Sequence, residues 1–160
     1  MEAALKTFFT SPRFAVAGAS SDRAKFGHKV FVWYLTHSLP ATPINLRAPT
    51  ISALGRDHAA VASPSALPAP ADTALSVITP PAVTLPLLRE AKGAGVRAVW
   101  LQPGTFDAEV LAYAEAAFPG AVVAGDMWGA SGGHGEGWCV LVDGEEGLRV
   151  AGREWEAARL

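Results

Sequence analysis

The sequence predicts a doubly wound α/β fold, in which helices cover both faces of a mostly parallel β-sheet and so make three layers. Short apolar runs alternate along the chain with longer amphipathic segments, which is the order of strands and helices in parallel sheets. Glycine, proline or small polar residues directly follow the apolar runs, as is typical of loops at the carboxyl ends of such strands. With 160 residues, half of them hydrophobic, the chain is long enough for one domain with a closed core.

The chain is expected to begin with a helix, a strand and a second helix. Residues 1–12 place apolar side chains on one side of a short helix, which a proline interrupts. A strand over residues 14–17 ends at Gly18, and apolar side chains at three- and four-residue spacing predict a helix from about Lys25 to His37. The polar residues before this helix are candidates for its N-cap: Ser20, Ser21 and Asp22.

Later apolar runs predict further strands over residues 42–46, 74–78, 96–101 and 121–124. One helix is expected over residues 81–93, where Pro81 suits the first turn. Another is expected over residues 107–118, with Thr105 or Asp107 as its cap.

Two regions lack a clear periodicity. Residues 47–72, rich in Ala, Pro and Ser, are interpreted mostly as loop, with a short strand over 58–62 and one helical turn over 63–67. Residues 127–160 are expected to pack as an extension on the domain formed by residues 1–126. This tail fits either a hairpin over residues 138–150 or a final helix from Arg153.

Composition excludes several classes of partner. The formal net charge is −2 and no Lys/Arg cluster occurs, so neither nucleic acid nor a membrane surface is an expected partner. No apolar run reaches the roughly 20 residues that cross a bilayer, and we expect a soluble, cytoplasmic protein. A single cysteine, Cys139, excludes an internal disulfide framework, and the four histidines lack metal-ligand spacing. A homodimer is compatible with the sequence, which leaves the oligomeric state open.

The loop that follows the first strand suits an anion. Small residues after Gly18 let the backbone approach phosphate oxygens, while Ser20 and Ser21 can donate hydrogen bonds and Lys25 supplies positive charge. The helix start adds unpaired N–H groups and the positive end of its dipole. The GxGxxG pattern is absent, because a longer loop separates Gly18 from Gly27. The sequence therefore predicts phosphate binding; the alternative is that Gly18 only turns the chain and Lys25 is solvated.

Asn45 and Arg47 follow the second strand, where an NAD site usually has a carboxylate for the ribose 2′-hydroxyl. An arginine in that place can pair with a phosphate on the ribose, which both coenzyme A and NADP carry. A solvated surface arginine is the alternative on spacing alone. The pattern favours a phosphorylated ADP, with coenzyme A ahead of NADP.

The residues that follow the predicted strands should share one edge of the sheet, because parallel strands all point their carboxyl ends the same way. That edge would bring together the segments 18–20, 45–47, 79–81 and 102–104 with Asp126.

Four stretches occur in an order that is more specific than any one of them: AVAGASSDRAKFGHKVFVWYL, PINLR followed by IxxLG, SVITPP, and GVRAVWLQPGTFDAEVLAYAEAA. Together they resemble the stand-alone CoA-binding domain proteins, which are similar to the nucleotide-binding domain of the succinyl-CoA synthetase α subunit. The resemblance covers roughly residues 12–126.

This resemblance implies a Rossmann-type fold with the ADP portion of coenzyme A lying across the strand ends. The first loop would hold the pyrophosphate, Asn45 and Arg47 would lie near the ribose and its phosphate, and residues 79–81 would border the nucleotide. Gln102 would lie at the pocket floor or near the pantetheine. The implied cofactor-binding residues are Gly18, Ala19, Ser20, Ser21, Lys25, Phe26, Gly27, Asn45, Arg47, Thr79, Pro80, Pro81 and Gln102.

The chain departs from the family pattern at two positions. Leu46 follows Asn45 where the family commonly has proline, which puts the ribose contact in doubt. Met127 follows Asp126 where the family commonly has cysteine, so no thiol role can be assigned there.

No complete catalytic apparatus is evident, because the phosphorylated histidine and the ligase domain of the synthetase lie beyond the matched part. The titratable groups near the last strand and tail are Asp126, His134, Glu136 and Cys139. We interpret His134 as a polar loop residue and Cys139 as a small buried side chain. We therefore expect a protein that binds coenzyme A without catalysis; the alternatives are an NADP-dependent oxidoreductase and an interaction module with a vestigial pocket.

Overall fold

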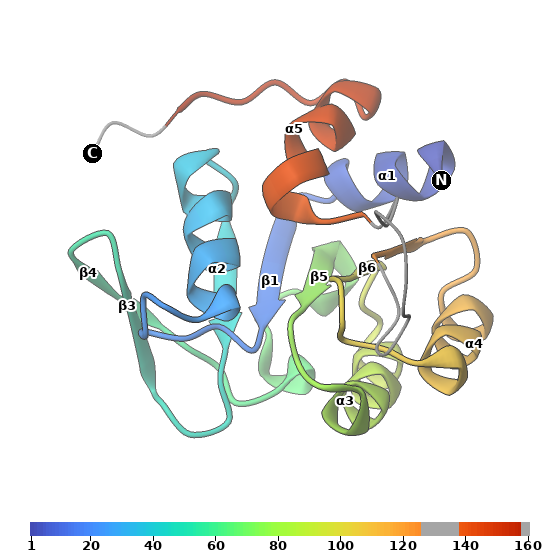
Figure 1. Cartoon of the computed structure of the whole chain (residues 1–160), viewed down its shortest axis with the longest axis horizontal. Helices are drawn as coiled ribbons and strands as arrows, with labels where there is room; N and C mark the ends of the chain where they lie inside the picture. Colours follow the sequence, from blue (N-terminus) through green and yellow to red (C-terminus); the bar gives the residue numbers. More distant parts are fainter. Residues whose placement is uncertain (126–137, 158–160) are drawn as a thin grey trace.

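A five-stranded parallel sheet forms the centre of the computed structural model, which describes residues 1–125 and 138–157 (Figure 1). The strand order is β2-β1-β5-β6-β7, and all four neighbouring pairs are parallel. The strands are β1 (Arg13–Ala17), β2 (Ala41–Ile44), β5 (Thr73–Val77), β6 (Ala98–Leu101) and β7 (Val122–Ala124). The order reverses between β1 and β5, as in doubly wound sheets, and the predicted fold class is confirmed.

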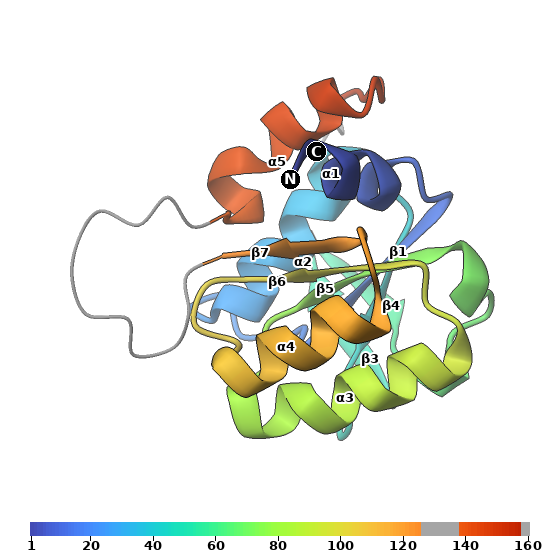
Figure 2. The same ribbon diagram turned by 90° about the vertical axis from the view of Figure 1, so that its right-hand side faces the viewer.

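Helices cover both faces of the sheet (Figure 2). One layer contains α1 (Glu2–Phe9), α2 (Phe26–Thr36) and α5 (Val140–Val150), and the other contains α3 (Pro81–Ala94) and α4 (Ala108–Ala117). None of the helices in the described parts of the chain is both long and apolar enough to span a bilayer.

The layer of α1, α2 and α5 packs on the sheet through aromatic side chains: Phe8, Phe9, Phe14, Trp33, Tyr34 and Trp100. Neighbouring rings in this cluster have centroids 5.2–6.2 Å apart, mostly in tilted or edge-to-face contact. All six residues are buried, so the cluster is part of the hydrophobic core.

The tail forms α5, and both alternatives expected for it, a hairpin over 138–150 and a helix from Arg153, were wrong. Two of its glycines, in the middle of the expected hairpin, face the aromatic cluster instead. A Cβ on Gly144 would lie 2.2 Å from Cζ2 of Trp33, and one on Gly147 would lie 2.6 Å from Cε2 of Phe9. The two glycines are one helical turn apart, and they let α5 approach rings that any larger residue would push away.

The segment between β2 and β5 contains more structure than expected. An antiparallel hairpin, β3 (Thr50–Ala53) and β4 (Arg56–Ala59), packs beside α2, and its two-residue turn places Leu54 and Gly55 at φ 52° and 73°. The strand expected over 58–62 is observed as β4, which spans residues 56–59. Val61, beyond its end, forms an isolated parallel bridge to Ile44 of β2. The helical turn expected over 63–67 is present as η1 (Pro64–Ala66), and η2 (Pro70–Asp72) precedes β5.

The caps of α2 and α4 differ. Asp107 caps α4 by accepting a hydrogen bond from the Val110 N–H at 2.9 Å. Neither Ser20, Ser21 nor Asp22 caps α2, because the N-cap position is Lys25 and no side chain fills it. Ser20 and Asp22 instead close the preceding loop on itself, since Ser20 Oγ accepts from the Asp22 N–H and Asp22 Oδ1 from the Ala24 N–H.

Candidate functional site

The loop after β1 is shaped by two glycines. Gly18 has φ 93°, and a Cβ there would lie 3.2 Å from the carbonyl carbon and oxygen of Ile78, which follows β5. Gly27, in the first turn of α2, lies against the carbonyl of Gly18 so closely that a Cβ would be 1.9 Å from that oxygen. The loop from residue 18 to residue 25 is therefore held between the end of β1 and the start of α2, whose first N–H groups have no side-chain cap.

Asn45 fastens the end of β2 to this loop. Its Nδ2 donates to the Ala19 carbonyl at 2.9 Å, and its Oδ1 accepts from the N–H groups of Arg47 and Ala48, both at 2.9 Å. These bonds turn the chain directly after β2 and leave the Arg47 side chain exposed. Within the described residues, Arg47 has no carboxylate at ion-pair distance.

A groove of about 450 Å³ lies at the carboxyl ends of β1, β2 and β5. Four of the residues expected from the sequence line it: Gly18, Asn45, Arg47 and Thr79. The opposite wall comes from α3, and Leu46, which is 82% exposed, also lines the groove beside Arg47.

The α3 wall of the groove is apolar. Val83, Pro86 and Leu87 face the groove, and Glu90 is the carboxylate among the lining residues of the described chain. Pro80 and Pro81, at the N-cap and first position of α3, have no N–H to donate, so this helix start offers little to an anion. The groove therefore joins an apolar slot to a cationic end at Arg47.

Sequence reasoning missed this apolar wall. The helix itself was expected, and Leu88 and Ala91 on its sheet side are fully buried. Positions 83, 86 and 87 also follow helical spacing, and an apolar stripe on the solvent side of a helix is the signal that could have identified them.

The family model of the CoA binding domain matches residues 12–127, a stretch that contains every element bordering the groove. The chain belongs to this CoA-binding domain family. Among curated proteins, no sequence relative was found.

Solved structures share the fold of this CoA-binding domain. A conserved hypothetical protein from Pyrococcus furiosus is 26% identical, with 82% of this chain and 97% of that chain covered and a TM-score of 0.64. A hypothetical protein from Pyrococcus horikoshii is 19% identical, with 92% of each chain covered and a TM-score of 0.71. A protein from Thermus thermophilus is 23% identical, with 92% of this chain and 98% of that chain covered and a TM-score of 0.68.

The remaining expected residues of the CoA-binding domain do not line the groove, and they lie in the first loop, at the start of α2 or α3, or, for Gln102, in the core. Ser20, Ser21 and Lys25 belong to the loop, and Phe26 begins α2. Lys25 is exposed and, within the described residues, is in no ion pair.

Gln102 is buried, and its amide is used inside the protein. Its Nε2 donates to Ser76 Oγ at 3.2 Å, and its Oε1 accepts from the Val140 N–H at 3.0 Å, at the start of α5. Ser76 Oγ also bonds the Tyr34 hydroxyl at 2.8 Å, and burial raises the pKa of that phenol well above its usual value. This chain of hydrogen bonds links α2, β5, β6 and α5, and Gln102 does not line the groove.

Of the four titratable residues named near the last strand and the tail, Cys139 is the one that the structure describes. Asp126, His134 and Glu136 lie outside the described residues. Cys139 is half-buried immediately before α5, and its N–H donates to Asp143 Oδ2 at 2.8 Å. Within residues 1–125 and 138–157, no three His, Cys, Asp or Glu side chains gather as metal ligands would.

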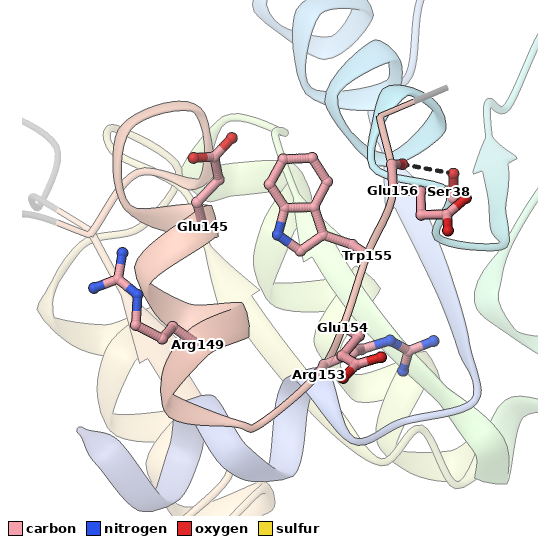
Figure 3. Close-up of a pocket in the computed structure, with 7 residues that line it drawn as sticks. All are labelled: Ser38, Glu145, Arg149, Arg153, Glu154, Trp155 and Glu156. Carbon is pink, nitrogen blue, oxygen red and sulfur yellow. Dashed lines mark hydrogen bonds between the residues drawn. The ribbon is translucent and has the colours of Figure 1, made fainter. Parts of the chain in front are cut away.

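A further cavity, of about 740 Å³, lies at the opposite end of the sheet (Figure 3). Segment 153–157 closes it, because Ser38 Oγ donates to the Glu156 carbonyl at 2.8 Å. The Arg153 guanidinium donates to the carbonyls of Phe9 and Ser11, just before β1, and partial burial lowers its pKa. Ligands of doubly wound sheets bind at the carboxyl ends of the strands, so the groove is a better candidate for the ligand site than this cavity.

Proposed function

We propose that this protein binds coenzyme A, with the ADP portion in the groove at the carboxyl ends of β1, β2 and β5. The observation that carries the proposal is Arg47, an exposed cation without an ion-pair partner in the described chain, at the groove end where a cofactor's ribose is expected. A carboxylate in that place would repel a ribose phosphate, whereas a guanidinium attracts one.

The other parts of the ADP group have matching surroundings. The adenine ring is assigned to the apolar wall of Val83, Pro86 and Leu87, where a flat apolar surface buries well. The pyrophosphate is assigned to the loop of residues 18–25, beside the free N–H groups at the start of α2 and the Lys25 ammonium. Of this loop, Gly18 lines the groove, so the pyrophosphate would lie at the end of the groove beside β1 and the pantetheine would extend beyond it.

Calorimetric titration with coenzyme A, 3′-dephospho-coenzyme A, NADP and NAD tests the proposal. We expect coenzyme A to bind about tenfold more tightly than its dephospho form, because only the former pairs with Arg47. NADP binding more tightly than coenzyme A would favour the oxidoreductase alternative. Absence of heat from every nucleotide would favour an interaction module with a vestigial pocket.

A pair of variants isolates the ribose phosphate. Arg47→Gln is expected to lower the affinity for coenzyme A about tenfold while leaving that for dephospho-coenzyme A unchanged. Arg97→Gln is the matched control, because Arg97 is also exposed but precedes β6 at the other end of the sheet. Equal losses for both nucleotides in Arg47→Gln would place the ribose phosphate elsewhere.

A further inference from the structure

A separate cavity, of about 790 Å³, lies between α2 and the β3–β4 hairpin. The hairpin stands beside α2 at the edge of the molecule (Figure 1). None of the residues that line this cavity also lines the groove. Two of its lining residues, Ser21 and Arg23, belong to the loop of residues 18–25 to which the pyrophosphate is assigned, so the cavity adjoins the proposed nucleotide site from the other side of that loop.

The lining of this cavity is basic. Arg23 from the loop, Lys29 from α2 and Arg56 from β4 contribute three cations, and Asp57 contributes the carboxylate among the lining residues. Asp57 Oδ1 is already engaged, since it accepts the Ser52 hydroxyl at 2.5 Å. Within the described residues, none of the three cations has a carboxylate at ion-pair distance. Such a concentration of unpaired positive charge is unusual on a chain whose net charge is −2.

His28 adds a buried polar group to the same cavity. The residue is 8% exposed, and its Nδ1 donates to the Ser20 carbonyl at 2.8 Å. In the described chain, Nε2 has no hydrogen-bond partner, although every fully shielded side-chain nitrogen and oxygen there has one. Nε2 is therefore not fully shielded, and His28 is one of the residues that line the cavity. Because Nδ1 carries a proton, Nε2 accepts a hydrogen bond in the neutral ring and donates one in the protonated ring.

The walls of the cavity are held together by hydrogen bonds. The Ser52 N–H of the hairpin donates to Ser21 Oγ of the loop at 2.8 Å. The tight turn at Leu54 and Gly55 places Arg56 on the side of the hairpin that lines the cavity with Lys29. The three cations thus come from three elements that are tied to one another, which limits how far the walls can separate.

We propose that this cavity is an anion site for the phosphate group of a phosphorylated small molecule, with His28 Nε2 as a contact in its wall and Arg23, Lys29 and Arg56 as its charged rim. A phosphate fits this set because it accepts several charge-assisted hydrogen bonds at once. The volume leaves room for the rest of the molecule beside the apolar side chains of Val32 and Leu54. The cavity shares no lining residue with the groove, although Ser21 and Arg23 come from the loop that is also assigned to the pyrophosphate.

Inorganic phosphate is the probe, titrated into the full chain at constant ionic strength and without nucleotide, with detection by NMR. We expect saturable shifts of the His28 ring nitrogen and of the backbone amides of Gly55 and Arg56. Affinity is expected on the order of millimolar, as for a single phosphate group held by a few side chains. Shifts confined to Gly18 and Arg47, or an absence of saturable shifts, would overturn the proposal.

Arg56→Gln tests the charged rim without disturbing the core, because Arg56 is exposed. We expect it to weaken phosphate binding roughly three- to tenfold, whereas Arg97→Gln, remote from the cavity, leaves it unchanged. Equal weakening in the two variants would show general charge screening and would count against a site. Coenzyme A affinity is expected to stay unchanged in Arg56→Gln, so failure here and failure of the proposed nucleotide site give different results.

Discussion

The carbonyl oxygen of Gly18 lies where a methyl group on Gly27 would have to be, at 1.9 Å from the ideal Cβ position. The contact joins Gly18, the residue directly after β1, to the first turn of α2. The two glycines therefore act as one structural unit, although eight residues separate them. Glycine at the second position allows the helix to start directly against the loop. This close backbone contact constrains the path of the loop that is assigned to the pyrophosphate.

Gly27→Ala should therefore be strongly destabilising. The added methyl group meets backbone, which cannot rotate aside as a side chain can, and we expect a loss of about 3 kcal/mol or more of the free energy of unfolding. Gly93→Ala is the control, because Gly93 lies in α3 with open space around it and should gain about 0.5–1 kcal/mol. Urea unfolding measures both. A Gly27→Ala protein as stable as the original would show that the loop moves freely.

Lys25→Glu should weaken the binding of coenzyme A and NADP by more than about tenfold, because it replaces attraction for phosphate by repulsion. Folding should change little, since Lys25 is exposed and makes no ion pair within the described residues. Lys92→Glu makes the same charge change in the last turn of α3 and is expected to leave affinity unaltered. Calorimetry measures the affinity of both variants. Unchanged affinity in Lys25→Glu would show that the phosphates of the ligand bind elsewhere at the carboxyl edge of the sheet.

Gln102→Met should lower stability by about 1–3 kcal/mol, because the Val140 N–H loses its buried acceptor. Methionine has a similar length, so the change removes hydrogen bonds more than volume. Thermal unfolding gives the stability, and calorimetry with coenzyme A gives the affinity of the folded protein. A loss of affinity without a loss of stability would assign Gln102 to the ligand, as the family resemblance implies, instead of to the start of α5.

Because of Tyr34, the free energy of unfolding should fall at alkaline pH. Burial raises the pKa of its phenol in the folded protein, so its contribution to stability is complete below the ordinary value of about 10 and declines as pH rises beyond it. In Tyr113→Phe, Tyr34 is the remaining tyrosine of two, and phenolate absorbance should appear only together with unfolding. Ionisation of a folded protein near pH 10 would contradict this expectation.

The strand ends were predictable because sequence signals and topology agree there. Apolar runs end at Gly18, Asn45 and Thr79, and in a parallel sheet their ends meet whatever the details of packing. That reasoning could not tell which polar groups face outward. Gln102 follows its strand as the others do, yet α5 covers it and takes its oxygen.

The parts that sequence reasoning missed depend on contacts between distant residues. Leu54 adopts a left-handed conformation in the hairpin turn, a place where asparagine or glycine is the usual signal. Gly144 and Gly147 suggested a turn, whereas they allow a helix to lie on Trp33 and Phe9. In both regions the conformational preferences of the residues themselves favour another structure. Packing against a neighbouring element, α2 for the hairpin and the aromatic cluster for α5, favours the observed one.

The packing of α1 against α5 has a consequence for how the protein is made. α1 precedes the sheet in the chain and α5 follows it, yet both are needed to enclose the rings of Phe8, Phe9 and Trp33. While the ribosome is still adding residues 140–150, the aromatic face of α1 and β6 has no cover. These aromatic rings therefore stay partly uncovered during synthesis until the residues of α5 have left the ribosome.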